Sequence, residues 1–329
     1  MDQAPKLDSI TEEKKGGLLG AFVKSAFGVA FGVGLAFLAI RWTGVSKEDL
    51  LSKLASAEPL RIFLAIFGGF ILTASQAVRW RAILQGVAPV RFWTVFQSKL
   101  VGYAANSVLP ARLGDLVRIE FVSTITNVPR SKILATGITD LWFDKIGWVI
   151  TFLIAYLVAP MPDWVLKAML VMGSLILLVG SVLYAASRWK AQPKPGTILA
   201  RFREGLDQPH LGKLFLHQLW LSPLSWCWET LLITFVARAF GIELNFSQAF
   251  AVLTAFYISM VVPIPANAGA FEVAATYALT AFGISADRAI AFALIYHLIL
   301  LIPGVAVGAA IFGTQTGKFK FFRRAGKLA

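Results

Sequence analysis

Long apolar runs alternate with short polar segments along most of the chain. Six runs have the length of a membrane crossing: 18–41, 59–80, 133–158, 164–187, 214–240 and 288–312. A helix needs about 20 predominantly apolar residues to cross a hydrocarbon core of roughly 30 Å. A spanning segment must also satisfy its own backbone hydrogen bonds, and the alternation typical of barrel strands is absent. The pattern therefore predicts an all-α, polytopic membrane protein.

Two further apolar segments are interrupted by Pro and Gly. Residues 92–130 break at the motif Pro-Ala-Arg-Leu-Gly (110–114), and residues 247–283 break at the motif Pro-Ala-Asn-Ala-Gly (265–269). The second motif follows the first at an offset of 155 residues, and the neighbouring crossings obey the same shift. This register predicts an internal repeat in which each copy contains one broken segment.

Loop charge predicts the orientation, because Lys and Arg are retained on the cytoplasmic side. Loop 188–213 carries six basic residues against two acidic ones, and the tail 313–329 carries five against none. We expect both to be cytoplasmic, as well as the N-terminal tail 1–17. The same rule assigns to this side the basic residues around the first broken segment: Arg79, Arg81, Arg91, Arg130 and Lys132.

For all of these basic segments to lie on the cytoplasmic side, each broken segment must begin and end on the same face of the membrane. Each is therefore predicted to be a re-entrant hairpin. The first would enter from the cytoplasm and the second from outside, so that repeat A (18–158) and repeat B (159–312) have opposite orientations. Inverted-topology repeats are typical of transporters that open alternately to either side. The alternative is that Pro and Gly only kink two ordinary spanning helices, which would give eight crossings.

Composition supports a membrane location. The chain has 329 residues, of which 57% are apolar and only 15% are charged, too few to solvate a globular surface of that size. The formal charge of +13 falls mainly in short loops and the C-terminal tail, where basic residues orient membrane helices. We therefore expect no nucleic-acid partner.

Several ionisable side chains fall within the predicted membrane region, where each costs at least about 2.5 to 3.5 kcal/mol. Asp140 and Asp144 are spaced i,i+4 and share one helix face, and Lys145 follows directly. Such groups require a partner, a watery cavity or a ligand. Internal salt bridges without any ligand are the alternative explanation for any single pair.

The broken helices add unpaired backbone amides and positive helix ends, which favour an anionic group. Arg112 and Arg118 are the expected contacts for a phosphate, because guanidinium binds phosphate in a fork. If the repeats pack together, both breaks would face one cavity. The candidate substrate-binding residues are Asn106, Arg112, Asp115, Arg118, Asp140, Asp144, Lys145, Glu229, Asn267, Glu272 and His297.

The common catalytic spacings GxSxG, HExxH, CxxC and the Walker loop are absent from the sequence. We therefore expect no catalytic residue, resident metal or cofactor. The remaining enzymatic candidate is the pair Asp140 and Asp144, since carboxylates at i,i+4 can hold Mg²⁺ against a diphosphate. Lys145 would compete with that metal.

Four stretches resemble the transmembrane domain of lysylphosphatidylglycerol synthases: Arg-Trp-Arg (79–81), Asn-Ser-Val-Leu-Pro-Ala-Arg-Leu-Gly-Asp-Leu-Val-Arg (106–118), Asp-Lys (144–145) and Pro-Ile-Pro-Ala-Asn-Ala-Gly-Ala-Phe-Glu (263–272). The resemblance covers about residues 20–313. In those synthases this domain flips an aminoacylated phospholipid that a separate cytosolic transferase domain makes. The sequence given contains no such transferase, so we expect a stand-alone member of the family.

The resemblance implies a flippase-like transporter in the plasma membrane of a bacterium or archaeon. Its cargo would be a phospholipid, a polyprenyl phosphate or a related glycolipid, with a phosphate-bearing headgroup as the partner of the site. Two alternatives stay open. One is a membrane-embedded lipid-modifying transferase that uses Asp140 and Asp144, and the other is a non-catalytic subunit that serves a separate lipid-modifying enzyme.

Overall fold

The computed structural model describes residues 48, 52, 55, 58–109, 112–188, 193–207, 211–262 and 264–315. The expected first crossing (18–41), the N-terminal tail and nearly all of the C-terminal tail lie outside the described residues, as do Pro110 and Pro263. The described residues are helical and contain no strand, which confirms the all-α prediction.

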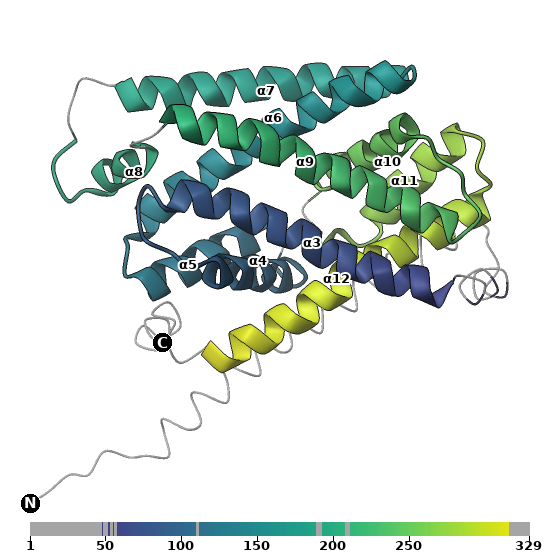
Figure 1. Cartoon of the computed structure of the whole chain (residues 1–329), viewed down its shortest axis with the longest axis horizontal. Helices are drawn as coiled ribbons and strands as arrows, with labels where there is room; N and C mark the ends of the chain where they lie inside the picture. The colour runs from purple at the N-terminus through teal and green to yellow at the C-terminus, as the bar shows by residue number, and fades with distance from the viewer. Residues whose placement is uncertain are drawn as a thin grey trace, which may run out of the picture.

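Five helices are long and apolar enough to cross a membrane. They are α3 (Pro59–Leu84), α6 (Arg130–Val158), α7 (Asp163–Arg188), α9 (Leu211–Arg238) and α12 (Ala286–Gln315). Four of them contain a predicted crossing and α9 overlaps all but the last two residues of 214–240, whereas the sixth crossing falls on residues that the structure does not describe. The five helices run roughly along the long axis of the molecule (Figure 1).

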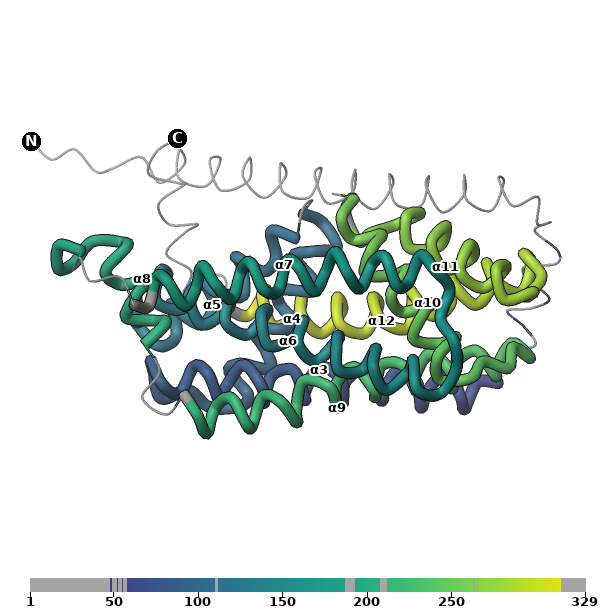
Figure 2. The backbone as a smooth tube through the Cα atoms, turned by 90° about the horizontal axis from the view of Figure 1, so that it is seen from above, coloured from purple at the N-terminus to yellow at the C-terminus, as the bar shows by residue number. Residues whose placement is uncertain are grey.

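Each broken segment forms two shorter helices that pack against each other. The first hairpin consists of α4 (Phe92–Asn106) and α5 (Gly114–Thr126). The second consists of α10 (Phe246–Ser259) and α11 (Ala270–Ala281), joined through the short 3₁₀ turn η1 (Pro265–Asn267). The chain therefore folds back at each break. The first hairpin lies toward one end of the long axis and the second toward the other (Figures 1 and 2).

The helix boundaries follow the offset that the sequence predicts. The first residues of α9, α10, α11 and α12 follow those of α3, α4, α5 and α6 by 152, 154, 156 and 156 positions. Helices α7 and α8 (Ile198–Leu206) lie between the two sets. The order of one long helix, two short helices and one long helix thus occurs twice, while the wider limits 18–158 and 159–312 stay predictions.

The two sets of helices are interleaved. α4 packs along α12, α3 packs along α9, and α6 packs along α9. The larger apolar core gathers α9 to α12 with parts of α6 and α7, and a smaller core surrounds Trp80 between α3, α4, α5 and α6. This interleaving brings the turns of both hairpins into the middle of the molecule. By contrast, α7 contacts only α6 and α8 closely among the described helices, and few of its apolar side chains are buried, as in a helix that faces lipid.

Candidate functional site

A cavity of about 260 Å³ lies between the two hairpins and helices α3, α6, α9 and α12. Asn106 and Arg112 line it from the first hairpin, and Met260 and Asn267 line it from the second. The two turns also meet directly, since Arg112 Nη1 lies 3.6 Å from the Sδ atom of Met260. Both breaks therefore face one space, at the place where the repeat predicts it.

The first break is held by close packing and by one side-chain bond. Asn106, the last residue of α4, accepts a hydrogen bond of 2.7 Å from the backbone N–H of Gly114, the first residue of α5. A Cβ atom on Gly114 would collide with the Asn106 side chain and with the carbonyl of Gly102. The hairpin therefore requires glycine at this position. Arg112 adopts a left-handed conformation (φ 57°) just before α5.

The second break is held from behind by a buried pair. Glu272 accepts a 2.7 Å bond from the backbone N–H of Gly269 and lies 2.7 Å from Nδ1 of His297. The other ring nitrogen of His297 lies 2.9 Å from the carbonyl oxygen of Ala266, where the chain is left-handed (φ 54°). Asn267 donates to Ser259 Oγ at 2.7 Å and so ties the turn to the end of α10.

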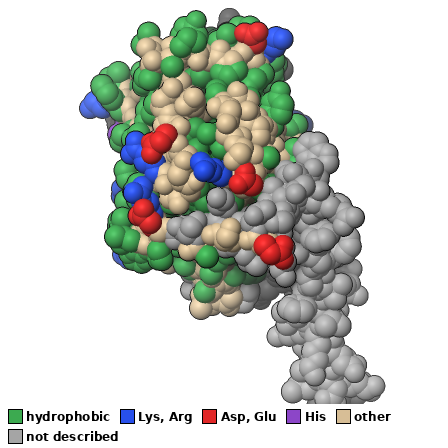
Figure 3. All heavy atoms as spheres, turned by 90° about the vertical axis from the view of Figure 1, so that its right-hand side faces the viewer, with side chains coloured by type: hydrophobic (Ala, Val, Ile, Leu, Met, Phe, Trp, Pro, Cys, Tyr) green, Lys and Arg blue, Asp and Glu red, His purple; other side chains and the backbone are tan. Residues whose placement is uncertain are grey.

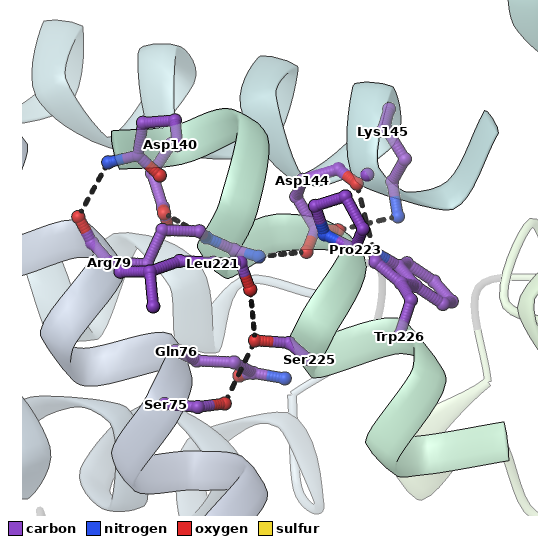
Figure 4. A network of polar contacts seen from close by, with 12 residues as sticks. Ser75, Gln76, Arg79, Asp140, Asp144, Lys145, Leu221, Pro223, Ser225 and Trp226 are labelled. Atoms are coloured by element: carbon purple, nitrogen blue, oxygen red, sulfur yellow. Dashed lines mark hydrogen bonds and ion pairs between the residues drawn. The ribbon is translucent and has the colours of Figure 1, made fainter. Parts of the chain in front are cut away.

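A buried ionic network joins α3, α4, α5 and α6, with Asp140 of α6 at its centre. Arg79 donates from Nε to Asp140 at 2.9 Å and from Nη1 to Asp144 at 2.6 Å, which joins α3 to two successive turns of α6 (Figure 4). Lys99 of α4 donates to the second oxygen of Asp140 at 3.1 Å. One carboxylate therefore ties α3, α4 and α6 together.

Arg118 of α5 joins this network less completely. Its Nε lies 3.0 Å from an oxygen of Asp115, and its Nη1 lies 3.7 Å from Asp140. Neither nitrogen has an acceptor in hydrogen-bond geometry among the described residues, although both are buried. The guanidinium carbon lies 4.6 Å from the centroid of a Trp80 ring. Arg118 thus lines the cavity while these two nitrogens are buried against Asp115 and Asp140.

Towards α9 and α10 the cavity wall is aromatic. Lys145 donates to Asp144 at 3.0 Å, and its Nζ lies 4.8 Å from the Trp226 ring and 4.9 Å from the Tyr257 ring. The indole of Trp226 donates to the backbone carbonyl of Asp144 at 2.9 Å (Figure 4). Glu229 of α9 accepts from the Tyr257 hydroxyl at 3.1 and 3.3 Å.

Ten of the eleven predicted site residues line this cavity: Asn106, Arg112, Asp115, Arg118, Asp140, Asp144, Lys145, Glu229, Asn267 and His297. Glu272, the eleventh, lies behind the wall and bonds to His297. Internal ion pairs and a cavity thus occur together, so the two explanations of the charged residues do not exclude each other.

Two charged cavity residues were missed by the sequence analysis. Lys99 was overlooked within the first broken segment. Arg79 was assigned to a cytoplasmic cluster, and that assignment is wrong: only 2% of the residue is exposed, and it binds Asp140 and Asp144. Helix α3 continues to Leu84, so Arg79 lies more than one turn inside the helix and points to the cavity.

Positive charge is in excess around the cavity. Its ionisable lining, apart from His297, consists of five cations, Arg79, Lys99, Arg112, Arg118 and Lys145, and four carboxyl groups, Asp115, Asp140, Asp144 and Glu229. With all of these ionised, one positive charge remains unbalanced. Among these five cations, Arg112 is the most accessible, with 46% of its side chain exposed.

The carboxylates that an enzymatic mechanism would assign to Mg²⁺ already have other partners. Asp140 and Asp144 each bind Arg79, and Lys145 binds Asp144 as well. Within the ranges that the structure describes, no group of three or more His, Cys, Asp or Glu side chains is arranged to hold a metal ion.

Comparison with known proteins places this architecture in a family. The family model described as "Lysylphosphatidylglycerol synthase TM region" matches residues 25–308. The chain belongs to this family. The match covers both hairpins and all five long helices almost to the end of α12, and it confirms the resemblance seen in the two broken motifs.

Two archaeal relatives are also similar over much of their length. A UPF0104 membrane protein of Methanothermobacter thermautotrophicus is 22% identical over 327 residues, which cover 90% of this chain and 95% of that protein. A UPF0104 membrane protein of Methanocaldococcus jannaschii is 28% identical over 218 residues, which cover 63% of this chain and 92% of that protein. With its five long apolar helices, this member of the lysylphosphatidylglycerol synthase transmembrane family is a multi-pass membrane protein.

Proposed function

We propose that the protein is a flippase-like transporter that moves a lipid with a phosphate-bearing headgroup between the two leaflets. The observation that carries the proposal is the cavity in which the turns of two broken hairpins meet beside five cationic side chains. Family membership supports a role connected with membrane lipids. Arg112 and Arg118 would contact the phosphate, since both line the cavity and 46% of the Arg112 side chain is exposed.

The arrangement of the hairpins supports movement between two sides. The hairpins lie toward opposite ends of the long axis and approach each other at Arg112 and Met260 (Figures 1 and 2). In transporters with inverted repeats, the substrate site lies near the midplane at the repeat interface and is formed by discontinuous helices. We infer that opening one hairpin would expose the cavity to one leaflet while the other hairpin stays closed.

Charge distribution supports an orientation for this movement. The end of the molecule that holds the first hairpin and α8 carries the described basic residues Arg81, Arg91, Arg130, Lys132, Lys194, Arg201, Arg203 and Lys213. At the opposite end, acidic and basic side chains occur together among apolar ones (Figure 3). Because Lys and Arg are retained on the cytoplasmic side, we propose that the first hairpin enters from the cytoplasm and that the C-terminus is cytoplasmic.

The test is lipid transfer in reconstituted vesicles. Fluorescently labelled phosphatidylglycerol, polyprenyl phosphate and an uncharged diacylglycerol would each be placed in one leaflet and their transfer followed by dithionite quenching. We expect transfer of a phosphate-bearing lipid and a loss of at least tenfold in Arg112→Ala. The matched control is Arg238→Ala, which removes an exposed arginine that pairs only with Glu243 at the end of α9.

Two results would contradict the proposal. Equal transfer by wild type and Arg112→Ala would remove the phosphate site, and no transfer of any lipid class would favour a non-catalytic subunit. Mass spectrometry of the lipids after incubation addresses the transferase alternative, because a lipid-modifying enzyme would change the mass of its substrate.

A further inference from the structure

Glu229 is the cavity carboxyl that the lipid site does not explain. It lies on α9, lines the cavity, and has 6% of its surface exposed. Both carboxyl oxygens lie at hydrogen-bond distance from the Tyr257 hydroxyl, at 3.3 and 3.1 Å. A hydroxyl can donate only one proton, so these contacts cannot neutralise a negative charge on Glu229.

The other buried carboxyl groups have charged or ionisable partners. Asp140 is in contact with Arg79, Lys99 and Arg118, and Glu272 is in contact with His297. For Glu229, the described part of the chain provides no Lys, Arg or His nitrogen within 4.0 Å. An unpaired carboxylate inside a membrane protein is strongly disfavoured, and the group takes up a proton instead.

Charged and titratable groups surround Glu229 on every helix that packs against α9, and none supplies the missing cation. Tyr257 comes from α10. Tyr296 and His297 come from α12, and His297 is held by Glu272 and by the carbonyl oxygen of Ala266. On α6, Lys145 is held by Asp144 and by the rings of Trp226 and Tyr257. On α3, Arg79 is held by Asp140 and Asp144. Tyr103, which reaches the cavity from α4, donates to Gln76 of α3.

We propose that Glu229 is a proton-binding site whose proton uptake is linked to the binding of an anionic headgroup in the cavity. This inference rests on the proposed lipid transport and deepens it by naming the co-transported ion. With Glu229 protonated, five cations face three carboxylates and the excess charge is two. With Glu229 ionised, the excess is one. An anion therefore binds better to the protonated form, and by reciprocity a bound anion favours protonation.

The linkage gives the carrier a route to use a proton gradient. A headgroup that enters the cavity stabilises the proton on Glu229, and departure of the headgroup makes release of that proton easier. Proton and lipid then cross together, so a proton gradient can direct the lipid without nucleotide hydrolysis. At a separation of roughly 10 Å and an effective dielectric constant of about 20, one unit charge changes an affinity about tenfold.

The proton site itself is tested by infrared spectroscopy of the full-length protein in lipid at neutral pH. We expect a carbonyl band of a protonated carboxylic acid that shifts in D₂O and disappears in Glu229→Gln. The matched control is Glu243→Gln, which removes an exposed carboxyl group in the loop after the same helix and should leave the band unchanged. A spectrum without this band, or a band that survives Glu229→Gln, would overturn the proton site.

The linkage is tested by calorimetric titration with short-chain phosphatidylglycerol, whose phosphodiester stays ionised over the pH range used. We expect the affinity of the wild type to increase about tenfold as the pH falls from about 9 to 5. Glu229→Gln should show a clearly smaller increase, because only the other titratable groups of the cavity remain. An identical pH dependence in both proteins would overturn the coupling. If vesicles show no lipid transfer while the infrared band is present, the transport function fails and the proton site stands.

Discussion

Arg112 and Asn267 lie 155 residues apart, and both adopt left-handed backbone conformations, with φ of 57° and 56°. They occupy equivalent places in the turns of the two hairpins, and both line the cavity. This conformation disfavours most residues other than glycine by roughly 1 to 2 kcal/mol, although asparagine tolerates it better than arginine does. Unfavourable backbone geometry is retained when the surrounding structure enforces it, and it clusters at functional sites.

Arg112→Gly separates the backbone role of this residue from its charge. Because glycine adopts a left-handed conformation freely, we expect the free energy of unfolding of the variant to differ from that of wild type by no more than about 1 kcal/mol. Lipid transfer should nevertheless fall at least tenfold, since the guanidinium is gone. Denaturation in detergent measures the first quantity and the vesicle assay the second. Unchanged transfer in a stable Arg112→Gly protein would show that the charge is dispensable.

Asp140→Asn should be the most damaging change in the ionic network. It leaves Arg79 and Lys99 buried without this carboxylate, and breaking a buried ion pair costs about 3 to 5 kcal/mol. Glu204→Gln is the control, because its pair with Lys132 is exposed and such pairs contribute at most about 1 kcal/mol. Thermal unfolding in detergent distinguishes the two. Adding Lys99→Met to Asp140→Asn should recover part of the loss, whereas an additive further loss would argue against their pairing.

Gly308→Ala tests the contact between the first hairpin and α12. A Cβ atom at this position would collide with the backbone carbonyl of Leu100 in α4, and overpacking of this kind costs typically about 1 to 3 kcal/mol. Gly69→Ala in α3 is the matched control, because nothing lies within 4 Å of the Cβ it would add. We expect lower thermal stability for Gly308→Ala only. Equal stability of both variants would mean that α4 and α12 are less closely packed.

Site-directed cysteine labelling tests the orientation. In a Cys227→Ala background, Glu243→Cys and Asp207→Cys place one thiol at each end of the long helices, and both positions are exposed. A membrane-impermeant maleimide added to intact cells should label Glu243→Cys and spare Asp207→Cys until the membrane is opened. The reverse pattern would invert the orientation, and labelling of both from outside would contradict the assignment of loop 188–213 to the cytoplasm.

Hydropathy and the spacing of Pro and Gly predicted the five described crossings and both breaks. These features are local consequences of chain chemistry: a helix in lipid must be apolar over its length, and a turn within it needs residues that accept unusual backbone angles. The offset of 155 residues was visible for the same reason, since each half repeats the order of apolar runs and breaks.

The ionic partners were harder to predict, because they depend on packing between distant segments. Arg79 looks like the basic flank of a crossing, yet α3 continues beyond it and α6 supplies two carboxylates. Lys99 is an isolated charge in an apolar stretch, and that feature could have marked it as a cavity residue. Glu229 and Tyr257, which lie 28 residues apart on the consecutive helices α9 and α10, are also paired, and nothing in either local pattern indicates it.

The contact between Arg112 and Met260 also bears on the reversibility of the proposed cycle. In that cycle, a headgroup arriving from either leaflet would meet the same obstacle, the Arg112 guanidinium against the Met260 thioether, and could displace it by side-chain rotation. A barrier common to both routes cannot by itself favour one direction. Net flow would then follow the difference in lipid and ion concentrations across the membrane, and reversing those differences would run the carrier backwards.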